Sequence, residues 1–388
     1  MSGSLRYAHY LRWNTAPSTR TPLDKEFRMR HRDVLIALLL HTTIVSAQPV
    51  PGIEELKHAM ELHDRGSYAE AISIYEELLA KHPDNPHLLY EIGLSSRAAG
   101  ELDDCISYAT QSAAAQPRAD SFSLLGSCHD DKGDRETALR AFEQGAQIAP
   151  RDVALNFNYA VTLARLGRYA EARERAAIAI EGRPTYPSPY FVYALALDGV
   201  ALHGAAALMH LRSIMWESHT PRARSAATLV VAQLNGYRDQ AKQKKLVISG
   251  MPKTPSPDTD LVLLDLAFGM SAQLSSTKLP ANATDADRFV NVLTDVVTVA
   301  GEIREKAPGG QFVWQYAAGP VLQLAQRGLL ETYLFAVAAM ADQQGATSWL
   351  NAHNDEVRRL TETLRELRQP NTVPQMQTPE MQVHFENR

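Results

Sequence analysis

The sequence has little of what catalytic and disulfide-rich proteins usually contain. Its 388 residues include two cysteines, Cys105 and Cys128, so the chain is not built on a framework of disulfides. It has no phosphate loop, no nucleophile elbow, and neither a His-Glu-x-x-His nor a Cys-x-x-Cys motif. We therefore predict that the protein is not an enzyme and carries no cofactor and no metal.

The net charge is small, and aromatic residues are few. The net charge of −5 gives no electrostatic basis for binding nucleic acid or an anionic membrane surface. Aromatic residues make up 7% of the chain, whereas alanine is abundant, and this bias favours closely packed helices over sheets. The composition predicts a globular, helical protein without an integral membrane segment.

Residues 29–47 have the three parts of a secretory signal peptide. Arg30 and Arg32 are basic, residues 34–45 are mostly apolar, and Ser46 and Ala47 are small residues suited to cleavage. The apolar stretch of about 12 residues is too short to span a bilayer. We expect a periplasmic or secreted protein cleaved near Ala47, with residues 1–28 an over-extended start. A buried helix of a cytosolic protein and an organelle transit peptide are the alternatives.

Four series of residues recur along the chain at common intervals of 34, 33 and 34 residues. They are Gly66, Gly100, Gly133 and Gly167; Pro83, Pro117, Pro150 and Pro184; Ala59, Gly93, Gly126 and Ala160; and Ala71, Cys105, Ala138 and Ala172. The glycines suit a left-handed turn between two helices, and the small residues let those helices approach closely. The prolines prevent continuation of the second helix. The period therefore predicts stacked helix pairs.

The residues that carry this pattern are clearest in the first, third and fourth units. They are Gly66, Tyr68, Ala71, Tyr75 and Pro83; Gly133, Ala138, Leu139, Phe142 and Pro150; and Gly167, Tyr169, Ala172 and Pro184. The pattern resembles the tetratricopeptide repeat family. The second unit departs from it, with Cys105 for the usual alanine and Ala109 for the usual aromatic residue.

The resemblance implies an all-α fold, an α-solenoid of helix hairpins within residues 48–219. The repeats are expected at 52–85, 86–118, 119–152 and 153–186, with a degenerate fifth at 187–219 in which Ala201 replaces the turn glycine. Residues 220–368 are predicted to form a helical C-terminal region that covers the open end of the solenoid. Residues 369–388 are polar and predicted to be disordered.

One segment of the C-terminal region also resembles other proteins. Residues 328–354 are similar to the C-terminal part of uncharacterised exported tetratricopeptide proteins of Gram-negative bacteria. The resemblance brings no activity with it. An unrecognised catalytic site in this helical half is the alternative to a purely interacting protein.

In the tetratricopeptide repeat family the concave surface is the usual binding site. The resemblance places the groove-facing residues at Tyr90, Leu94, Arg97, Ser123, Ser127, Asp130, Asp131, Phe157, Val161 and Arg165. Family members that bind chaperone carboxylate tails use lysine and asparagine there, and this chain lacks that set. We expect an exported interaction module or assembly scaffold that binds a peptide or helix of a protein partner.

Two side-chain groups near the third repeat invite other interpretations. Cys128, His129, Asp130 and Asp131 include metal-ligating types, but consecutive helical residues point about 100° apart and cannot converge on one ion. Cys105 lies on a helix adjacent to that of Cys128. The sequence allows either a disulfide between these cysteines or two separate buried thiols, and we favour the separate thiols.

Overall fold

The computed structural model describes residues 52–242, 259–306 and 312–368. Within these ranges every secondary-structure element is a helix, which confirms the predicted all-α fold. The predicted signal peptide at 29–47, the over-extended start at 1–28 and the polar tail at 369–388 lie outside the described residues.

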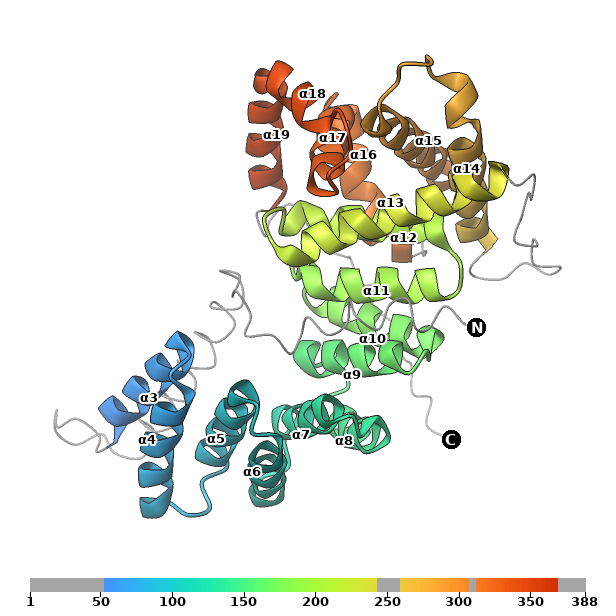
Figure 1. Ribbon diagram of the computed structural model, residues 1–388. Helices are drawn as coiled ribbons and strands as arrows, with labels where there is room; N and C mark the ends of the chain where they lie inside the picture. The colour runs from blue at the N-terminus through green and yellow to red at the C-terminus, as the bar shows by residue number, and fades with distance from the viewer. Residues whose placement is uncertain (1–51, 243–258, 307–311, 369–388) are drawn as a thin grey trace, which may run out of the picture.

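The first part of the structure is a stack of helix pairs, which Figure 1 shows from blue to green. Each predicted repeat contains one pair of antiparallel helices. The pairs are α3 (Ile53–Arg65) with α4 (Tyr68–Lys81), α5 (Pro86–Ala99) with α6 (Leu102–Ala115), α7 (Ala119–Lys132) with α8 (Arg135–Ile148), α9 (Val153–Arg165) with α10 (Tyr169–Gly182), and α11 (Pro187–Gly199) with α12 (His203–Trp216).

The turns within the pairs follow the glycine series. Gly66, Gly100, Gly133 and Gly167 have φ angles between 75° and 94°, the left-handed conformation that the sequence predicts. In the fifth pair Ala201 adopts the same conformation, with φ 60°. The fifth turn therefore keeps the left-handed backbone conformation although alanine replaces the glycine.

The stack is curved. The first helices of successive repeats pack side by side, as α5 does on α7, α7 on α9 and α9 on α11, whereas successive second helices make no comparable contacts. Helices that approach one another more closely lie on the inside of a curve. The first helices therefore line the concave side of the solenoid.

The C-terminal region is also helical, and it covers the end of the stack. Its elements are α13 (Pro221–Lys242), α14 (Thr259–Lys278), α15 (Asp285–Lys306), a short π-helix η2 (Trp314–Ala318), α16 (Gly319–Gln326), α17 (Leu330–Met340), α18 (Ala346–Ala352) and α19 (Asn354–Leu367). Helix α12 contacts α11, α13, α14, η2 and α16, and every residue from Gly204 to Trp216 is buried. A helix that is apolar on all sides needs neighbours on all sides, and the C-terminal region supplies them.

Helix α14 caps the start of α12 from a distance in sequence. The carboxylate of Asp265 accepts hydrogen bonds from the backbone N–H of His203 (2.9 Å), the backbone N–H of Gly204 (3.4 Å) and the hydroxyl of Tyr237 (3.0 Å). A side chain at Gly204 would meet the backbone of Leu264. The fifth repeat and the C-terminal region are thus held together by a buried cap and close backbone packing.

The buried apolar residues form three clusters of unequal size. The largest runs from Ala138 in α8 to Leu367 in α19, and a smaller one joins α3, α4 and α5. Between them lies a cluster whose fully buried members are Cys105, Ala109 and Cys128, with Leu124 beside them. The joint between the second and third repeats therefore has the thinnest apolar core of the stack.

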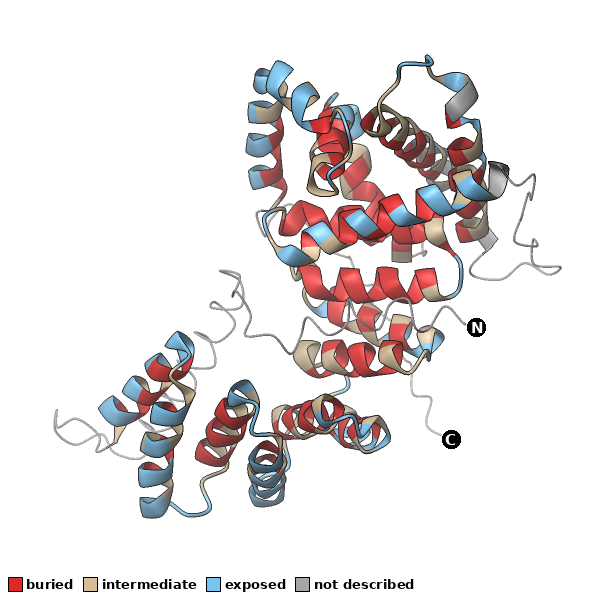
Figure 2. Ribbon diagram, viewed as in Figure 1, coloured by how far each residue is buried: buried red, intermediate tan, exposed pale blue. Residues whose placement is uncertain are grey.

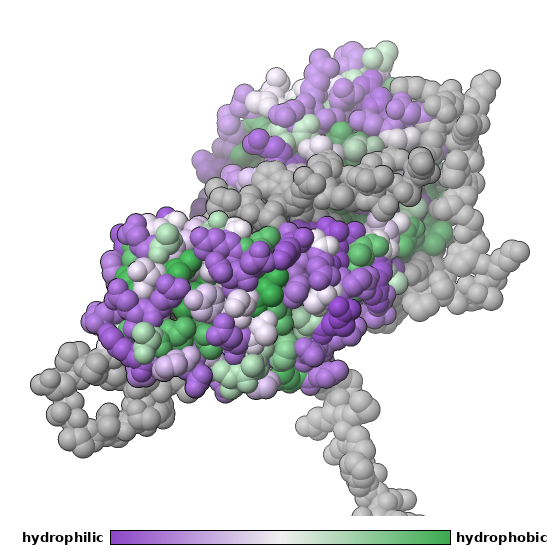
Figure 3. All heavy atoms as spheres, turned by 60° about the horizontal axis from the view of Figure 1, so that its bottom comes forward, coloured by the Kyte–Doolittle hydropathy of each residue, from purple (hydrophilic) through white to green (hydrophobic). Residues whose placement is uncertain are grey.

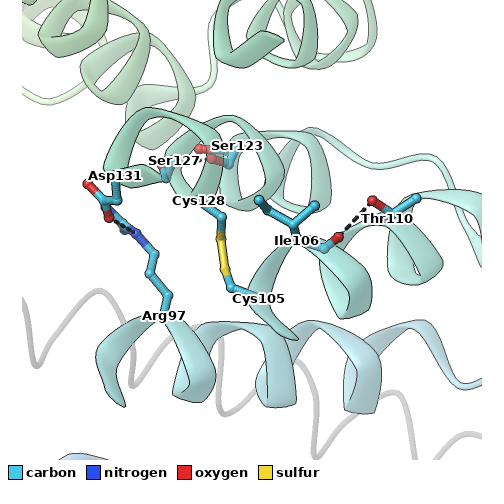
Figure 4. The surroundings of a disulfide bond; sticks show 8 residues. All are labelled: Arg97, Cys105, Ile106, Thr110, Ser123, Ser127, Cys128 and Asp131. Carbon is cyan, nitrogen blue, oxygen red and sulfur yellow. Dashed lines mark hydrogen bonds and ion pairs between the residues drawn. A yellow bond between two sulfur atoms is a disulfide. The ribbon is translucent and has the colours of Figure 1, made fainter. Parts of the chain in front are cut away.

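Cys105 and Cys128 are joined in a disulfide, with their Cα atoms 6.1 Å apart. Our preference for two separate thiols was therefore wrong. Cys105 takes the inward position that alanine holds in the other repeats, and Cys128 faces it from α7, as Figure 4 shows. Adjacency was evident from the sequence, whereas the direction of the Cys128 side chain was not.

Candidate interaction surface

The predicted groove residues lie on the first helices α5, α7 and α9, which line the concave side. Tyr90, Leu94 and Arg97 are on α5, while Phe157, Val161 and Arg165 are on α9. Helix α7 between them carries Ser123, Ser127, Asp130 and Asp131. The repeat brings these residues onto neighbouring helices because each set occupies related positions in its unit.

The charged residues of this set form a ladder of ion pairs across the three helices. Arg97 Nε lies 2.7 Å from Asp131 Oδ2, and Arg165 binds Asp130 through one guanidinium nitrogen. The same guanidinium lies 3.9 Å from Asp131 Oδ1. Arg135 at the start of α8 adds an ion pair of 3.2 Å to the other oxygen of Asp130. Three arginines and two aspartates from three successive repeats therefore bind one another.

This ladder is largely buried. The side chains of Asp130, Asp131 and Arg165 are 5%, 9% and 9% exposed, and Arg97 retains 23%. Buried charges are stable when they are paired, so this network links the repeats and fixes their spacing. A signal was present in the sequence, since Arg97, Asp131 and Arg165 follow one another at intervals of 34 residues with alternating sign.

Polar hydrogen bonds make similar links nearby. Asn158 of α9 donates to Ser123 Oγ on α7 (3.2 Å), and Ser127 donates to the carbonyl oxygen of Ser123 (2.8 Å). Two repeats earlier in the stack, His63 of α3 hydrogen-bonds Ser95 of α5 at 2.8 Å. The sequence reasoning missed Asn158, His63 and Ser95, because none of them belongs to a recurring series.

The apolar candidates differ in their exposure. Phe157 is 6% exposed and packs edge to face on Tyr186, with ring centres 5.3 Å apart, and Val161 is buried as well. Tyr90 and Leu94 are half-buried and rest against the cysteine cluster. Tyr90 and Leu94 are therefore the most accessible apolar residues of the predicted set. Figure 3 shows a mosaic of hydrophilic and hydrophobic residues on the face of the N-terminal repeats.

The four consecutive residues at the end of α7 do not form a metal centre. Cys128 is in the disulfide, Asp130 and Asp131 bind arginines, and His129 Nδ1 lies 3.5 Å from Asp134. Burial lowers the pKa of His129. In the described ranges, no three His, Cys, Asp or Glu side chains are placed to hold a metal ion.

A second group of polar residues lies where the solenoid meets the C-terminal region. The carboxylate of Asp198 lies between two histidines of α12, 3.1 Å from His203 Nδ1 and 3.3 Å from His210 Nε2. The side chains of Asp198 and His210 have no exposed surface. The group fixes α12 against α11, and no substrate could reach Asp198 or His210 without local opening.

None of the helices in the described part of the chain has the length and apolar character needed to cross a bilayer.

A family model for the tetratricopeptide repeat matches residues 48–243, half of the chain and all of helices α3 to α13. A comparison with curated protein sequences gives no significant match.

Three solved structures of tetratricopeptide repeat proteins are similar to part of this chain. TTC0263 of Thermus thermophilus is 18% identical with a TM-score of 0.40, and the likeness covers 45% of this chain and 95% of that one. The C-terminal part of a repeat-containing protein from Cytophaga hutchinsonii is 13% identical with a TM-score of 0.39, over 66% and 97% of the two chains. YrrB, described as having an unusual peptide-binding site, is 17% identical with a TM-score of 0.36, over 45% and 91%.

Proposed function

This chain belongs to the tetratricopeptide repeat family, and from that premise we propose that it is an interaction module or assembly scaffold that binds another protein. The binding surface is the concave side formed by α5, α7 and α9. The ligand is an extended or helical segment of the partner, because a curved stack of helices offers a long and continuous surface of that shape.

The ion-pair ladder is the observation that carries this proposal. It fixes α5, α7 and α9 relative to one another before any ligand arrives, and a preorganised surface loses less entropy on binding. The ladder also leaves little unpaired charge on the surface. The partner segment is therefore anchored by apolar or aromatic side chains against Tyr90 and Leu94, not by a strongly charged tail.

Export belongs to the same proposal. The pattern at residues 29–47 predicts a secretory signal, and the Cys105–Cys128 disulfide is of the kind that forms and persists in an oxidising compartment. Both observations support a periplasmic or secreted location. The first residue of the protein purified from its native host is expected to be Gln48, by N-terminal sequencing. A mature chain that still carries residues 1–28 would refute export by this signal.

An enzyme with a site in the C-terminal half is the alternative function. An acid–base group lies at the edge of that half, where Asp198 pairs with His203 and His210. Two of these three side chains are fully buried, so their geometry favours a structural role over a catalytic one.

The binding surface can be tested by adding one charge to it. Leu94→Glu places a carboxylate beside the half-buried apolar contact without removing any member of the ladder. If Leu94 anchors the partner, capture from an extract of the native compartment should weaken by about tenfold or more, as for a typical anchor residue. Quantitative pull-down with mass spectrometry would identify the partner and measure the loss.

Ile148→Glu is the matched control. Ile148 lies at the end of the second helix α8 and is 48% exposed, so it is another accessible aliphatic residue away from the concave side. Its substitution should leave capture of the same partner unchanged. If Ile148→Glu weakens capture and Leu94→Glu does not, the partner binds elsewhere and the proposed surface is wrong.

A further inference from the structure

The second repeat lacks the aromatic residue that the first and third repeats carry next to the joint with the following unit. In the first and third repeats that position holds Tyr75 and Phe142, both fully buried, whereas the second and fourth hold Ala109 and Ala176. A methyl group provides far less apolar contact than a ring. At this joint the cysteine pair occupies the space beside Ala109.

The remaining contacts at this joint are polar pairs and a small apolar cluster around Leu124. Ser112 Oγ lies 2.8 Å from Ser121 Oγ, and Arg97 binds Asp131. Lys132 also pairs with Asp103, but the Asp103 side chain is 85% exposed, so water screens that pair. Besides the covalent bond, the second and third repeats are therefore joined by the Arg97–Asp131 pair, by serine hydrogen bonds and by the smallest apolar cluster of the stack.

The same bond lies beside the proposed binding surface. Cys128 is on α7 next to Ser127, and the Arg97–Asp131 pair reaches α7 about one turn away, as Figure 4 shows. A change in the distance between α6 and α7 would therefore alter the position of α7 relative to α5. The surface extends across this joint, since Tyr90 and Leu94 lie on one side and Ser123 and Asp130 on the other.

We propose that Cys105 and Cys128 form a redox switch of the interaction surface. As thiols they leave the joint between the second and third repeats open and the surface incomplete; as a disulfide they close the joint and complete it. This inference rests on the proposed function only in that the concave side binds a partner. The joint itself can be tested without one.

The chemistry is thiol–disulfide exchange with an external disulfide as the oxidant. The thiolate of one cysteine attacks a sulfur of that disulfide and displaces one thiolate, which leaves a mixed disulfide on the protein. The second cysteine thiolate attacks this bond, forms the Cys105–Cys128 bond and releases the other thiolate. A dithiol reverses both steps and supplies the same two electrons as it is oxidised. Both protein sulfurs are buried, so the reagents reach them when the joint is open.

As a consequence, the complete binding surface forms only when the chain is in an oxidising compartment. A chain made in a reducing compartment keeps the joint open, and the chain closes it after transfer to an oxidising one. If the reduced chain is closed about one tenth of the time, its apparent Kd for the partner is about tenfold higher than that of the oxidised chain. Binding would then be suppressed until export is complete.

Hydrogen exchange of the full chain, with and without dithiothreitol, tests the joint directly. Reduction should speed exchange of amides in α5, α6 and α7 by about tenfold, because opening of the joint removes their protection. Amides of α11 and α12, which lie far from the bond in the large core, should not change. Equal exchange of α5 to α7 in the oxidised and reduced chains would overturn the switch, whatever the partner assays show.

The double variant Cys105→Ala/Cys128→Ala serves as the permanently open form. Alanine is the residue that the first, third and fourth repeats carry at the position of Cys105, so this change introduces no unusual side chain. The variant should exchange like the reduced native chain, and dithiothreitol should have no further effect on it. Exchange like that of the oxidised native chain would show that the bond does not control the joint.

Discussion

The N-terminal arm (α3 to α8) and the start of the C-terminal body (α9 to α19) are built from the same repeat, but different contacts stabilise the two parts. In the arm, the apolar contacts of α3 to α7 are divided between two small clusters, and about half of the residues on the outer helices α4, α6 and α8 are exposed. Only α8 of the arm contributes to the large cluster. In the body, one cluster includes every helix from α9 to α19, and α11 and α12 are buried along almost their whole length. Figure 2 shows this contrast as red in the body and more pale blue in the arm.

The difference follows from the number of neighbours that each helix has. A repeat in a linear stack contacts the units before and after it, so its stability depends on those two interfaces. The fifth repeat has the fourth repeat on one side, and α13, α14, η2 and α16 of the C-terminal region cover the remaining sides of α12. The arm can therefore change its curvature while the body stays folded, and the proposed binding surface spans the boundary between them.

The largest effect is expected where the arm meets the body, at Arg165. Arg165→Ala leaves Asp130 and Asp131 buried with one ionic partner fewer, and breaking such a pair costs about 3 kcal/mol or more. The free energy of unfolding should fall by that amount in urea denaturation followed by circular dichroism. Arg168→Ala is the control, because its pair with Glu171 is exposed and contributes about 0.5 kcal/mol. Equal losses in the two variants would mean that the ladder does not join arm and body.

High pH should lower the stability of the body more than the stability of the arm. Burial raises the pKa of Tyr190 to about 12, and burial also raises the pKa of Tyr333 and Tyr237. A group whose pKa is higher in the folded state stabilises that state below its unfolded pKa, near 10, and loses this effect as pH rises through 12. For Tyr190 the loss reaches about 2.7 kcal/mol, from two pKa units.

Thermal unfolding between pH 9 and 11.5 measures this dependence. Tyr190→Phe cannot ionise, so its melting temperature should fall less steeply with pH than that of the native chain. In the arm, burial also raises the pKa of Tyr108, but this side chain is only partly buried and solvent reduces the effect. An identical pH slope in Tyr190→Phe and the native chain would exclude this source of alkaline instability.

Two glycines of the body should respond in opposite directions to alanine. At Gly204 the added methyl group would meet the backbone of Leu264, which cannot move aside as a side chain can, so we expect a loss of about 2 kcal/mol. Gly236 in α13 is exposed, with nothing within 4 Å of the methyl group that alanine would add, and this change should stabilise the fold by about 0.5–1 kcal/mol. Urea denaturation of both variants separates the close packing of α12 on α14 from the general effect of helix propensity.

The fold could be predicted from the sequence because its signals are local and repeated. Gly66 and its counterparts mark the turns of the first four helix pairs, and the apolar spacing marks each helix. The ties between repeats were harder to predict, because they depend on which way a side chain points. Arg97 and Asp131 were assigned to the groove surface, yet they bind each other, and Cys128 proved to face Cys105. The Asp265 cap on α12 joins residues 62 positions apart outside the period, and no sequence pattern indicates it.

The smallest predicted effect concerns Ala201, where the body departs from the repeat. Its φ of 60° costs a residue with a Cβ atom about 1–2 kcal/mol, and glycine avoids this cost. Part of the gain is offset because glycine also makes the unfolded chain more flexible, by about 0.5–1 kcal/mol. Ala201 is exposed, so its methyl group contributes little packing. Ala201→Gly should therefore stabilise the protein by up to about 1 kcal/mol and raise Tm by about 2–4 °C. Gly167→Ala, at the equivalent turn of the fourth repeat with φ 75° and open space around the added methyl group, should lower Tm by a similar amount. If Ala201→Gly leaves Tm unchanged or lowers it, the fifth turn is not held in the left-handed conformation, and the last repeat of the body differs from the others in its backbone as well as in its sequence.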